Sequence, residues 1–315
     1  VMFDCALFDI DGVLVDIRKS YNAAIKKTVE YMLKSITGKS FRNLVTDQII
    51  LKFRASGGFN NDTDTTYAIT LAMLARPART LVEGRKFLMQ VAGNADESGY
   101  LSVEKYLVNY GIERWKKLLV YPAPVSDSML ARVFDELFYG PELFKKQDHL
   151  EPKYWAGGTP FIKNDRLAVS TRTMKKLHEM FEGNLAIVSG RSRLAAEYSL
   201  RPVIKYFNLD ACVFLEDEKH EYAKPNPYAI KHAMKVMNAR TAVYAGDSAE
   251  DLLMARRAEK ESSVKITFVG VYGNSPRPAK TAAQFRQEGV EAIAKSADQL
   301  PNTINACGIR TKETR

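Results

Sequence analysis

The sequence is poor in the residues that build disulfide frameworks and histidine metal sites. It holds three cysteines and four histidines among 315 residues. Cys5, Cys212 and Cys307 have no metal-ligand spacing and leave an odd count, which predicts reduced, mostly buried thiols. The histidines are scattered without the spacing of metal ligands, and we assign them no role.

Long hydrophobic runs are lacking as well. No uninterrupted apolar stretch approaches the roughly 18 to 20 residues that a membrane helix needs. The first residues also lack the basic and then apolar build of a signal peptide. Hydrophobic and charged contents of 46% and 26% are ordinary for a chain that buries a core. We therefore expect a cytoplasmic enzyme without a membrane partner.

The basic residues are numerous but dispersed. The net charge of +9 favours anionic partners in general. The densest basic clusters are only pairs, such as Lys26-Lys27 and Arg256-Arg257. No basic stripe carries aromatic residues interleaved at stacking distance, as a nucleic-acid surface would. This pattern argues against nucleic acid and favours a small phosphorylated substrate.

Short apolar runs that end in small or polar residues predict buried parallel strands. The clearest are residues 6–10, 185–188, 241–245 and 266–271, with residues 211–215 as a weaker candidate. Helical patterns separate these runs, and such alternation predicts an α/β fold with a doubly wound parallel sheet. Ligands of such sheets bind beyond the carboxyl ends of the strands.

Capping residues mark several helices between these strands. Ser170 is placed to begin a helix that Gly183 ends, and Asn226-Pro227 reads as a cap followed by a first-turn proline. The polar tail after Asn302 is expected to be frayed.

The stretch after the first predicted strand has little strand character and many helical patterns. One pattern runs from near Ile17 to Gly38, and another covers residues 126–139. The simplest account is a helical domain inserted directly after the first strand. We predict an α/β core of residues 1–16 and 166–315, and a helical domain of residues 17–165.

Two carboxylates, Asp9 and Asp11, lie two residues apart where the first predicted strand ends, and Gly12 follows them. Residues i and i+2 of a strand share a face, so the two acids are expected side by side. Two carboxylates at such a short distance raise each other's proton affinity unless a cation or a proton lies between them. The pattern suits a divalent metal, or a nucleophile with an acid/base partner.

A polar segment, Ser189-Gly190-Arg191-Ser192, follows the strand predicted over residues 185–188. A hydroxyl with exposed backbone N–H groups and a nearby arginine suits a phosphate group, so Gly190 and Arg191 are candidate substrate contacts. An ordinary turn is the alternative for Ser189-Gly190, and surface charge is the alternative for Arg191.

Two more segments bring a lysine and acids close to strand ends. Lys224 comes directly before the proline-stiffened helix start, where a lysine without context is usually solvated. Asp247 and Asp251 follow the strand predicted over residues 241–245. Asp251 could simply decorate the first turn of a helix, whereas Asp247 at the strand end is harder to explain without a function.

In this order, Asp-x-Asp-Gly, Ser, Lys and Gly-Asp-Ser-x-x-Asp resemble the motifs of the haloacid dehalogenase superfamily. The resemblance covers residues 4–16 and 185–300, and the insertion resembles the superfamily's helical cap. Within the superfamily the chain is most similar to subfamily IA, although the cap is unusually long. Residues 57–62 also resemble a poorly characterised branch of that subfamily.

The resemblance implies a Mg²⁺-dependent phosphatase that hydrolyses a small phosphorylated metabolite through an aspartyl-phosphate intermediate. Asp9 would be the nucleophile, and Asp11 would protonate the leaving oxygen and then deprotonate water. Ser189 would bind phosphoryl oxygens, and Lys224 would offset the charge of Asp9 and the phosphate.

The resemblance also implies a magnesium site. Asp9, Asp247 and a backbone carbonyl of Asp11 would hold the ion, and Asp251 would ligate it or orient the site. Magnesium prefers octahedral oxygen ligation with few carboxylates, and it completes its shell with phosphate and water.

Substrate selection is expected from the inserted domain. Asn60 and Asn61 follow a pair of glycines and could point into the site, because a cap loop of this kind contacts the leaving group in the family. The alternative is a solvated turn in which Asp62 or Asp64 caps the next helix.

Asp11 separates the reaction types that the resemblance leaves open. The superfamily's dehalogenases lack an acid at this position because a halide needs no proton to leave, so carbon–halogen chemistry is not expected. A phosphomutase of the same fold and a non-catalytic binding protein stay open as alternatives. The sequence specifies neither the phosphate ester nor the oligomeric state, and a homodimer stays open.

Overall fold

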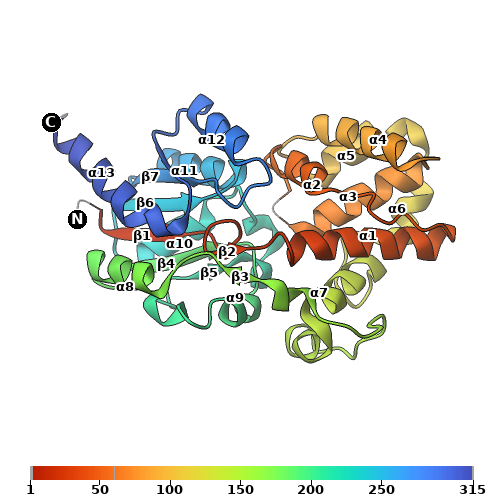
Figure 1. The fold of residues 1–315 in the computed structure, drawn as a ribbon, viewed down its shortest axis with the longest axis horizontal. Coiled ribbons are helices and arrows are strands. Elements are labelled where there is room, and N and C mark those ends of the chain that lie inside the picture. The colour runs from red at the N-terminus through yellow and green to blue at the C-terminus, as the bar shows by residue number, and fades with distance from the viewer. Residues whose placement is uncertain (1–2, 60, 314–315) are drawn as a thin grey trace. The chain divides into compact units, whose positions relative to one another are not determined.

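The computed structural model describes residues 3–59 and 61–313. Contacts within the chain divide it into two compact units (Figure 1). The first unit comprises Val1–Asp16 and Arg166–Arg315, and the second comprises Ile17–Asp165.

The first unit is built on a six-stranded sheet in which every neighbouring pair is parallel. In spatial order its strands are β5 (Val213–Phe214), β4 (Leu185–Ser189), β1 (Cys5–Phe8), β6 (Thr241–Gly246), β7 (Lys265–Val271) and β8 (Ala292–Ala294). All four residues of β1 are buried, as expected for a central strand with both faces covered. The predicted doubly wound α/β fold is confirmed.

Helices of the first unit follow the strands along the chain (Figure 1). They are α8 (Thr171–Met180), α9 (Arg193–Ser199), α10 (Tyr228–Val236), α11 (Ala249–Glu261), α12 (Pro278–Gln287) and α13 (Leu300–Glu313). Short 3₁₀ turns lie at Ile204–Tyr206, Leu215–Asp217, His220–Tyr222 and Ala297–Gln299.

Helix starts in this unit partly match the capping residues seen in the sequence. Ser170 caps α8, because its hydroxyl accepts the Thr173 N–H at 3.1 Å. The expectation for Asn226-Pro227 is wrong by one position. Pro227 itself is the N-cap residue of α10, and Asn226 Oδ1 accepts the Tyr228 N–H at 2.9 Å. The segment after Asn302, which was expected to be frayed, is helical as far as Glu313 in α13.

The two chain segments at which the units are connected pair in a short antiparallel ribbon. It pairs β2 (Val15–Asp16) with β3 (Arg166–Leu167), so that Val15 faces Leu167. The chain therefore leaves the first unit and returns to it at neighbouring points.

All the regular secondary structure described in residues 17–165 is helical. Its helices are α1 (Tyr21–Thr37), α2 (Asp47–Arg54), α3 (Asp62–Ala75), α4 (Leu81–Gly93), α5 (Tyr100–Tyr106), α6 (Glu113–Leu119) and α7 (Met129–Asp148), with 3₁₀ turns at Val108–Tyr110 and Phe161–Asn164. Gly38 ends α1 with a left-handed backbone at φ +73°, as its position predicted. The predicted helix over residues 126–139 begins later, after the N-cap Ser128, and continues across a kink at Gly140.

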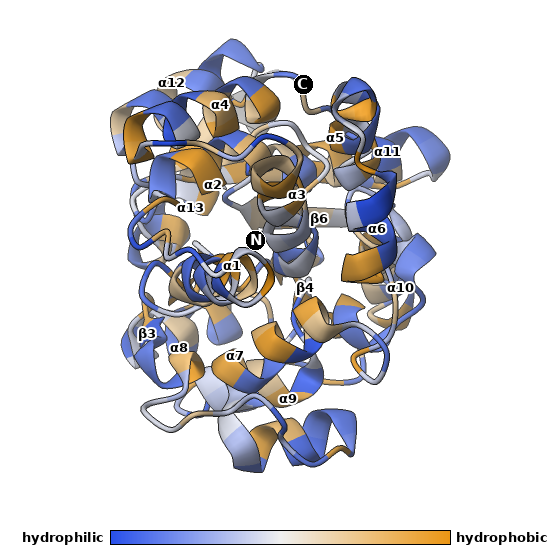
Figure 2. Cartoon of the chain, turned by 90° about the vertical axis from the view of Figure 1, so that its right-hand side faces the viewer, coloured by the Kyte–Doolittle hydropathy of each residue, from blue (hydrophilic) through white to orange (hydrophobic). Residues whose placement is uncertain are grey.

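Helical periodicity explains how the second unit forms its core. Helix α4 buries Gly84, Phe87, Leu88, Val91 and Ala92, which lie three or four residues apart on one side. Figure 2 shows hydrophobic and hydrophilic residues interleaved along α4 and α7. Helix α3 is buried on nearly all sides and forms the centre of this unit.

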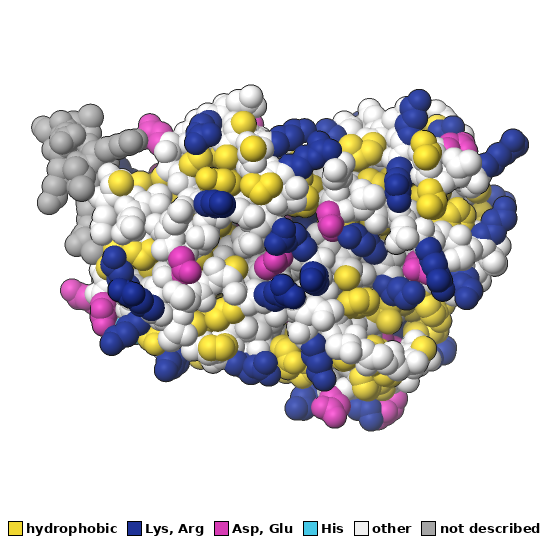
Figure 3. Space-filling model, viewed as in Figure 1, with side chains coloured by type: hydrophobic (Ala, Val, Ile, Leu, Met, Phe, Trp, Pro, Cys, Tyr) yellow, Lys and Arg dark blue, Asp and Glu magenta, His cyan; other side chains and the backbone are white. Residues whose placement is uncertain are grey.

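Neither a membrane-spanning helix nor a single basic patch is seen in the part of the chain that the structure describes and Figure 3 displays. Within residues 3–59 and 61–313, no helix combines the length and the apolar character needed to cross a bilayer. Lysine and arginine side chains are spread over the face seen in Figure 3 and do not gather in one patch.

Candidate active site

The predicted site residues of the core gather at the carboxyl end of β1, between β4 and β6. These two strands flank β1 in the sheet, so the chain order reverses here and ligands are expected beyond the strand ends. Asp9 is the first residue after β1, and its N–H donates to the Ala245 carbonyl at 2.9 Å. A compact turn follows, in which the N–H groups of Leu14 and Val15 donate to the Ile10 carbonyl.

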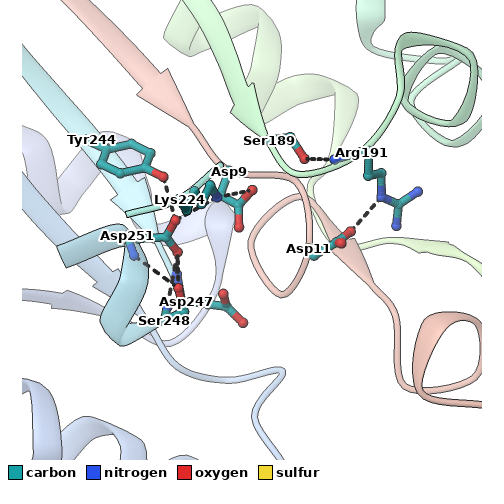
Figure 4. A network of polar contacts seen from close by, with 9 residues as sticks. All are labelled: Asp9, Asp11, Ser189, Arg191, Lys224, Tyr244, Asp247, Ser248 and Asp251. Atoms are coloured by element: carbon teal, nitrogen blue, oxygen red, sulfur yellow. Dashed lines mark hydrogen bonds and ion pairs between the residues drawn. The ribbon is translucent and has the colours of Figure 1, made fainter. Parts of the chain in front are cut away.

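Asp9 and Asp11 do not share a strand face. The expectation that they lie side by side is wrong, because β1 already ends at Phe8 and the chain turns after Asp9. The Asp11 side chain turns toward Arg191, whereas Asp9 turns toward Lys224 (Figure 4). The two acids therefore have different surroundings.

Lys224 is the buried cation of this site. Its Nζ lies 2.9 Å from Asp9 Oδ1 and 2.7 Å from Asp251 Oδ1, with the side chain 1% exposed. Burial lowers the pKa of Lys224, but the carboxylates of Asp251 and Asp9 outweigh it and the net shift is upward. Lys224 is therefore buried, in contrast to the solvated position that is usual for a lysine before a helix.

Burial is the main influence on the nucleophile candidate. It raises the pKa of Asp9 to about 7, against the opposing effect of Lys224, and the negative charges of Asp251 and Asp11 add to the rise. The folded protein therefore holds a proton on Asp9 more readily than an exposed aspartate would.

Asp251 is fully buried at the start of α11 and forms a capping box with Ser248. Its Oδ2 accepts the N–H groups of Asp247 and Ser248, at 3.1 and 3.2 Å, and the Ser248 hydroxyl at 2.8 Å. Its Oδ1 accepts the Tyr244 hydroxyl at 2.6 Å and Lys224. Because both oxygens are occupied by donors, the geometry favours an orienting over a ligating Asp251.

Asp247 lies against the turn after β1. Gly12 has φ +75°, and a Cβ built on it would lie 1.8 Å from Asp247 Oδ2. A glycine is therefore required here both for backbone conformation and for the close approach of the carboxylate. The Asn274 amide also contacts this turn, because it donates to the Gly12 carbonyl at 3.0 Å.

Asp9, Asp247 and Asp251 form a cluster that could hold a metal ion. One carboxylate oxygen from each lies within 4.8 Å of the others. Carboxylate oxygens are ligands that Mg²⁺ prefers, so Asp9 and Asp247 fit this ion. The Asp11 side chain is outside the cluster, which leaves its backbone carbonyl as the group predicted to contribute.

Ser189 and Arg191 come from the end of β4. Ser189 is fully buried, and its hydroxyl accepts the Arg191 N–H at 3.3 Å. The Arg191 guanidinium donates from Nε to Asp11 Oδ1 at 2.6 Å and from Nη1 to the Ser199 hydroxyl at 2.9 Å. Surface charge is thus the wrong alternative for Arg191, which is 1% exposed. Gly190 is half-buried between these two residues.

The predicted substrate contacts of the second unit lie around the start of α3. Asn60 lies outside the described residues. Asn61 is exposed and caps α3, because its side chain accepts the Thr63 N–H at 2.8 Å. The alternative in which Asp62 or Asp64 caps this helix is wrong. Asp62 pairs with Arg54 at 2.6 Å, and Asp64 accepts the Tyr121 hydroxyl.

Two residues beside the site, Tyr244 and Asn274, were not predicted from the sequence. Tyr244 lies inside the apolar run of β6, where an aromatic residue indicates only core packing. Asn274 lies in the loop after β7, and its contact with Gly12 joins residues 262 positions apart. No local pattern signals either contact.

Comparison with known proteins agrees with the fold and the motifs. A family model described as haloacid dehalogenase-like hydrolase matches residues 3–259. Phosphatase Tt82 from Thermococcus thioreducens is similar in fold, with 24% identity, a TM-score of 0.57 and coverage of 90% of this chain and 99% of that chain. A hydrolase from Pseudomonas syringae has 16% identity and a TM-score of 0.49, with coverage of 96% and 98%. No curated protein matches the sequence.

Proposed function

The chain belongs to the haloacid dehalogenase-like hydrolase family and is an enzyme, and from this premise we propose that it is a Mg²⁺-dependent phosphatase. Its substrate would be a small phosphorylated metabolite, hydrolysed through an aspartyl-phosphate intermediate. The observation that carries the proposal is Lys224, buried between Asp9 and Asp251. A non-catalytic protein has no need of a buried cation held against a carboxylate at a strand end.

Asp9 is proposed as the nucleophile. Lys224 holds one of its oxygens at 2.9 Å, which fixes the carboxylate and offsets its charge. One Asp9 oxygen would form a bond to phosphorus while the bond from phosphorus to the ester oxygen breaks. The buried Ser189 hydroxyl would donate to a phosphoryl oxygen and hold the group in line with Asp9.

Asp11 is proposed as the acid and base. It would give a proton to the leaving ester oxygen in the first step. In the second step it would take a proton from the water that attacks phosphorus, which breaks the bond to Asp9 and releases inorganic phosphate. The Arg191 contact at 2.6 Å fixes the orientation of the Asp11 side chain and favours its ionised form, which the second step uses as the base.

Asp9, Asp247 and the Asp11 carbonyl are proposed to hold Mg²⁺, with Asp251 as the residue that orients the site. When bound, the ion would neutralise the repulsion between these carboxylates and the phosphoryl group. The three-carboxylate cluster and the raised pKa of Asp9 support a cation at this place.

The two units are proposed to divide the work. Residues 1–16 and 166–315 would carry the chemistry, and residues 17–165 would act as the cap that selects the substrate. Asn61 stays a candidate substrate contact, although its side chain also caps α3.

The test is phosphate release by the purified chain with Mg²⁺ and para-nitrophenyl phosphate, followed by a panel of phosphorylated metabolites. We expect turnover that EDTA removes and Mg²⁺ restores, and we expect Asp9→Asn to abolish it. Asp210→Asn is the matched control, because Asp210 is exposed in the same unit. Turnover that survives in Asp9→Asn would contradict the assignment, and phosphate moved between two hydroxyls of one sugar would indicate a mutase.

A further inference from the structure

Tyr244 is a fully buried polar residue that the proposed mechanism does not use. It lies in β6, next to β1, and its ring contacts Phe268 of β7 edge-on at 5.8 Å. A phenylalanine would fill the same space in the core. The hydroxyl therefore needs a separate explanation, and its contact with Asp251 Oδ1 at 2.6 Å provides one.

The Asp251 carboxylate is clamped from two sides. Ser248 and two backbone N–H groups at the start of α11 hold Oδ2, whereas Tyr244 of the sheet and Lys224 hold Oδ1. Tyr244 is the donor that comes from inside β6, a strand paired on both sides in the sheet. It therefore fixes the position of Oδ1 relative to the sheet.

The same oxygen determines where the ammonium group lies. Lys224 Nζ is shared between Asp251 Oδ1 at 2.7 Å and Asp9 Oδ1 at 2.9 Å. Figure 4 shows the resulting chain of contacts from Tyr244 through Asp251 and Lys224 to Asp9. A small rotation of Asp251 would change the contact between Lys224 and Asp9, because both contacts involve one nitrogen.

We propose that Tyr244 is a positioning residue that holds Asp251, and through it Lys224, in the place where the ammonium group contacts Asp9. Its part in turnover rests on the proposed phosphatase function, whereas the chain of contacts does not. Without the hydroxyl, Asp251 pivots about its capping box and draws Lys224 with it. Phosphoryl transfer to Asp9 then slows, while substrate affinity is kept because Tyr244 is buried in β6 and its hydroxyl is bound to Asp251.

The kinetic test compares Tyr244→Phe with Tyr228→Phe. Tyr228 is half-buried in the same unit and stacks on Tyr222. We expect Tyr244→Phe to lower kcat about tenfold, the effect of one hydrogen bond to a charged group, with KM within about twofold of the wild type. Tyr228→Phe should match the wild type. Equal kcat values for the two variants, or a loss expressed only in KM, would overturn the proposal.

A second measurement tests the chain of contacts without relying on activity. Urea unfolding is compared for the wild type, Tyr244→Phe, Lys224→Met and the double variant. We expect the two changes to be non-additive, because they remove two donors from one oxygen of Asp251. Additive effects would overturn the chain of contacts. A wild type that hydrolyses no phosphate ester would refute the proposed function alone, and if Lys224→Met does not fold, the kinetic comparison decides.

Discussion

Substitution of Gly12 by alanine tests whether the turn after β1 sets the position of Asp247. The new Cβ would lie 1.8 Å from Oδ2 of Asp247, 2.4 Å from its Cγ and 3.0 Å from its Cβ. Carbon and oxygen atoms in contact need more than 3 Å, so the carboxylate must retreat by about 1.5 Å. The backbone of the turn is held in place by two hydrogen bonds. The Gly12 N–H donates to the Val15 carbonyl, and the Gly12 carbonyl accepts the Asn274 amide.

Gly289→Ala is the matched control for backbone strain. Gly289 lies in the same unit with φ +77°, and a Cβ built on it meets nothing within 4 Å. Both variants carry the strain of a left-handed alanine, about 1–2 kcal/mol, but Gly12→Ala alone displaces Asp247. We expect the free energy of unfolding to fall by about that amount in Gly289→Ala, with unchanged turnover.

For Gly12→Ala we expect kcat/KM to fall by about 100-fold or more, because a misplacement of about 1 Å at reacting groups costs roughly that factor. The Mg²⁺ concentration for half-maximal activity should rise as well. The assay is phosphate release over a Mg²⁺ titration, with urea unfolding of both variants in parallel. The reasoning would be refuted if Gly12→Ala kept the turnover and Mg²⁺ dependence of Gly289→Ala.

Two further predictions concern the buried Arg191 of the first unit and the half-buried Asp148 of the second. Arg191→Met should lower kcat about 10-fold to 100-fold. Arg191→Lys should not restore kcat, because lysine cannot contact Asp11 and Ser199 in the same way. An unchanged kcat would exclude a role for this ion pair. Burial raises the pKa of Asp148 from 3.8 to about 6, so the folded protein binds the proton more tightly than the unfolded chain. The free energy of unfolding should therefore fall as pH rises from about 4 to 6, by about 1 kcal/mol once solvent screening is allowed for. Asp148→Asn should flatten this part of a urea-unfolding pH profile, and an unaltered slope would count against the assignment.

The sheet could be predicted from the sequence where its strands are long enough to form an apolar run. The four main strands were found within about two residues at each end. The ribbon of Val15–Asp16 with Arg166–Leu167 and the strand Ala292–Ala294 were missed, because two or three residues have no periodicity. Their pairing depends on contacts with segments far away in the chain.

Helix ends could be predicted where the signal is local. Ser170 and Gly38 act within one turn of their own helices, so the sequence suffices to find them. At α10 the same reasoning is wrong by one residue. Pro227 takes the N-cap position, and the Asn226 side chain accepts the Tyr228 N–H. The helix Leu300–Glu313 was not predicted, because its polar composition gives no clear hydrophobic periodicity.

The positions of the site residues could be predicted better than their side-chain directions. Strand ends bring Asp9, Ser189 and Asp247 to one edge of the sheet, and spacing along the chain is enough to see this. The direction of Asp11 depends on Arg191, 180 residues away, and no spacing rule contains that pair. A buried arginine was therefore read as a residue that could equally lie on the surface.

Charge balance connects these observations to the proposed cation. Asp9, Asp11, Asp247 and Asp251 are opposed by two bases, Lys224 and Arg191, and each base pairs with specific acids. Both Asp251 oxygens accept hydrogen bonds, Asp11 pairs with Arg191, and Asp9 shares Lys224 with Asp251. The four carboxylates therefore outnumber these two cations by two. Burial is the main cause of the raised pKa of Asp9, and the negative charges of Asp251 and Asp11 add to it. On the proposed function, a divalent ion held by Asp9, Asp247 and the Asp11 carbonyl would supply two positive charges to this group of acids.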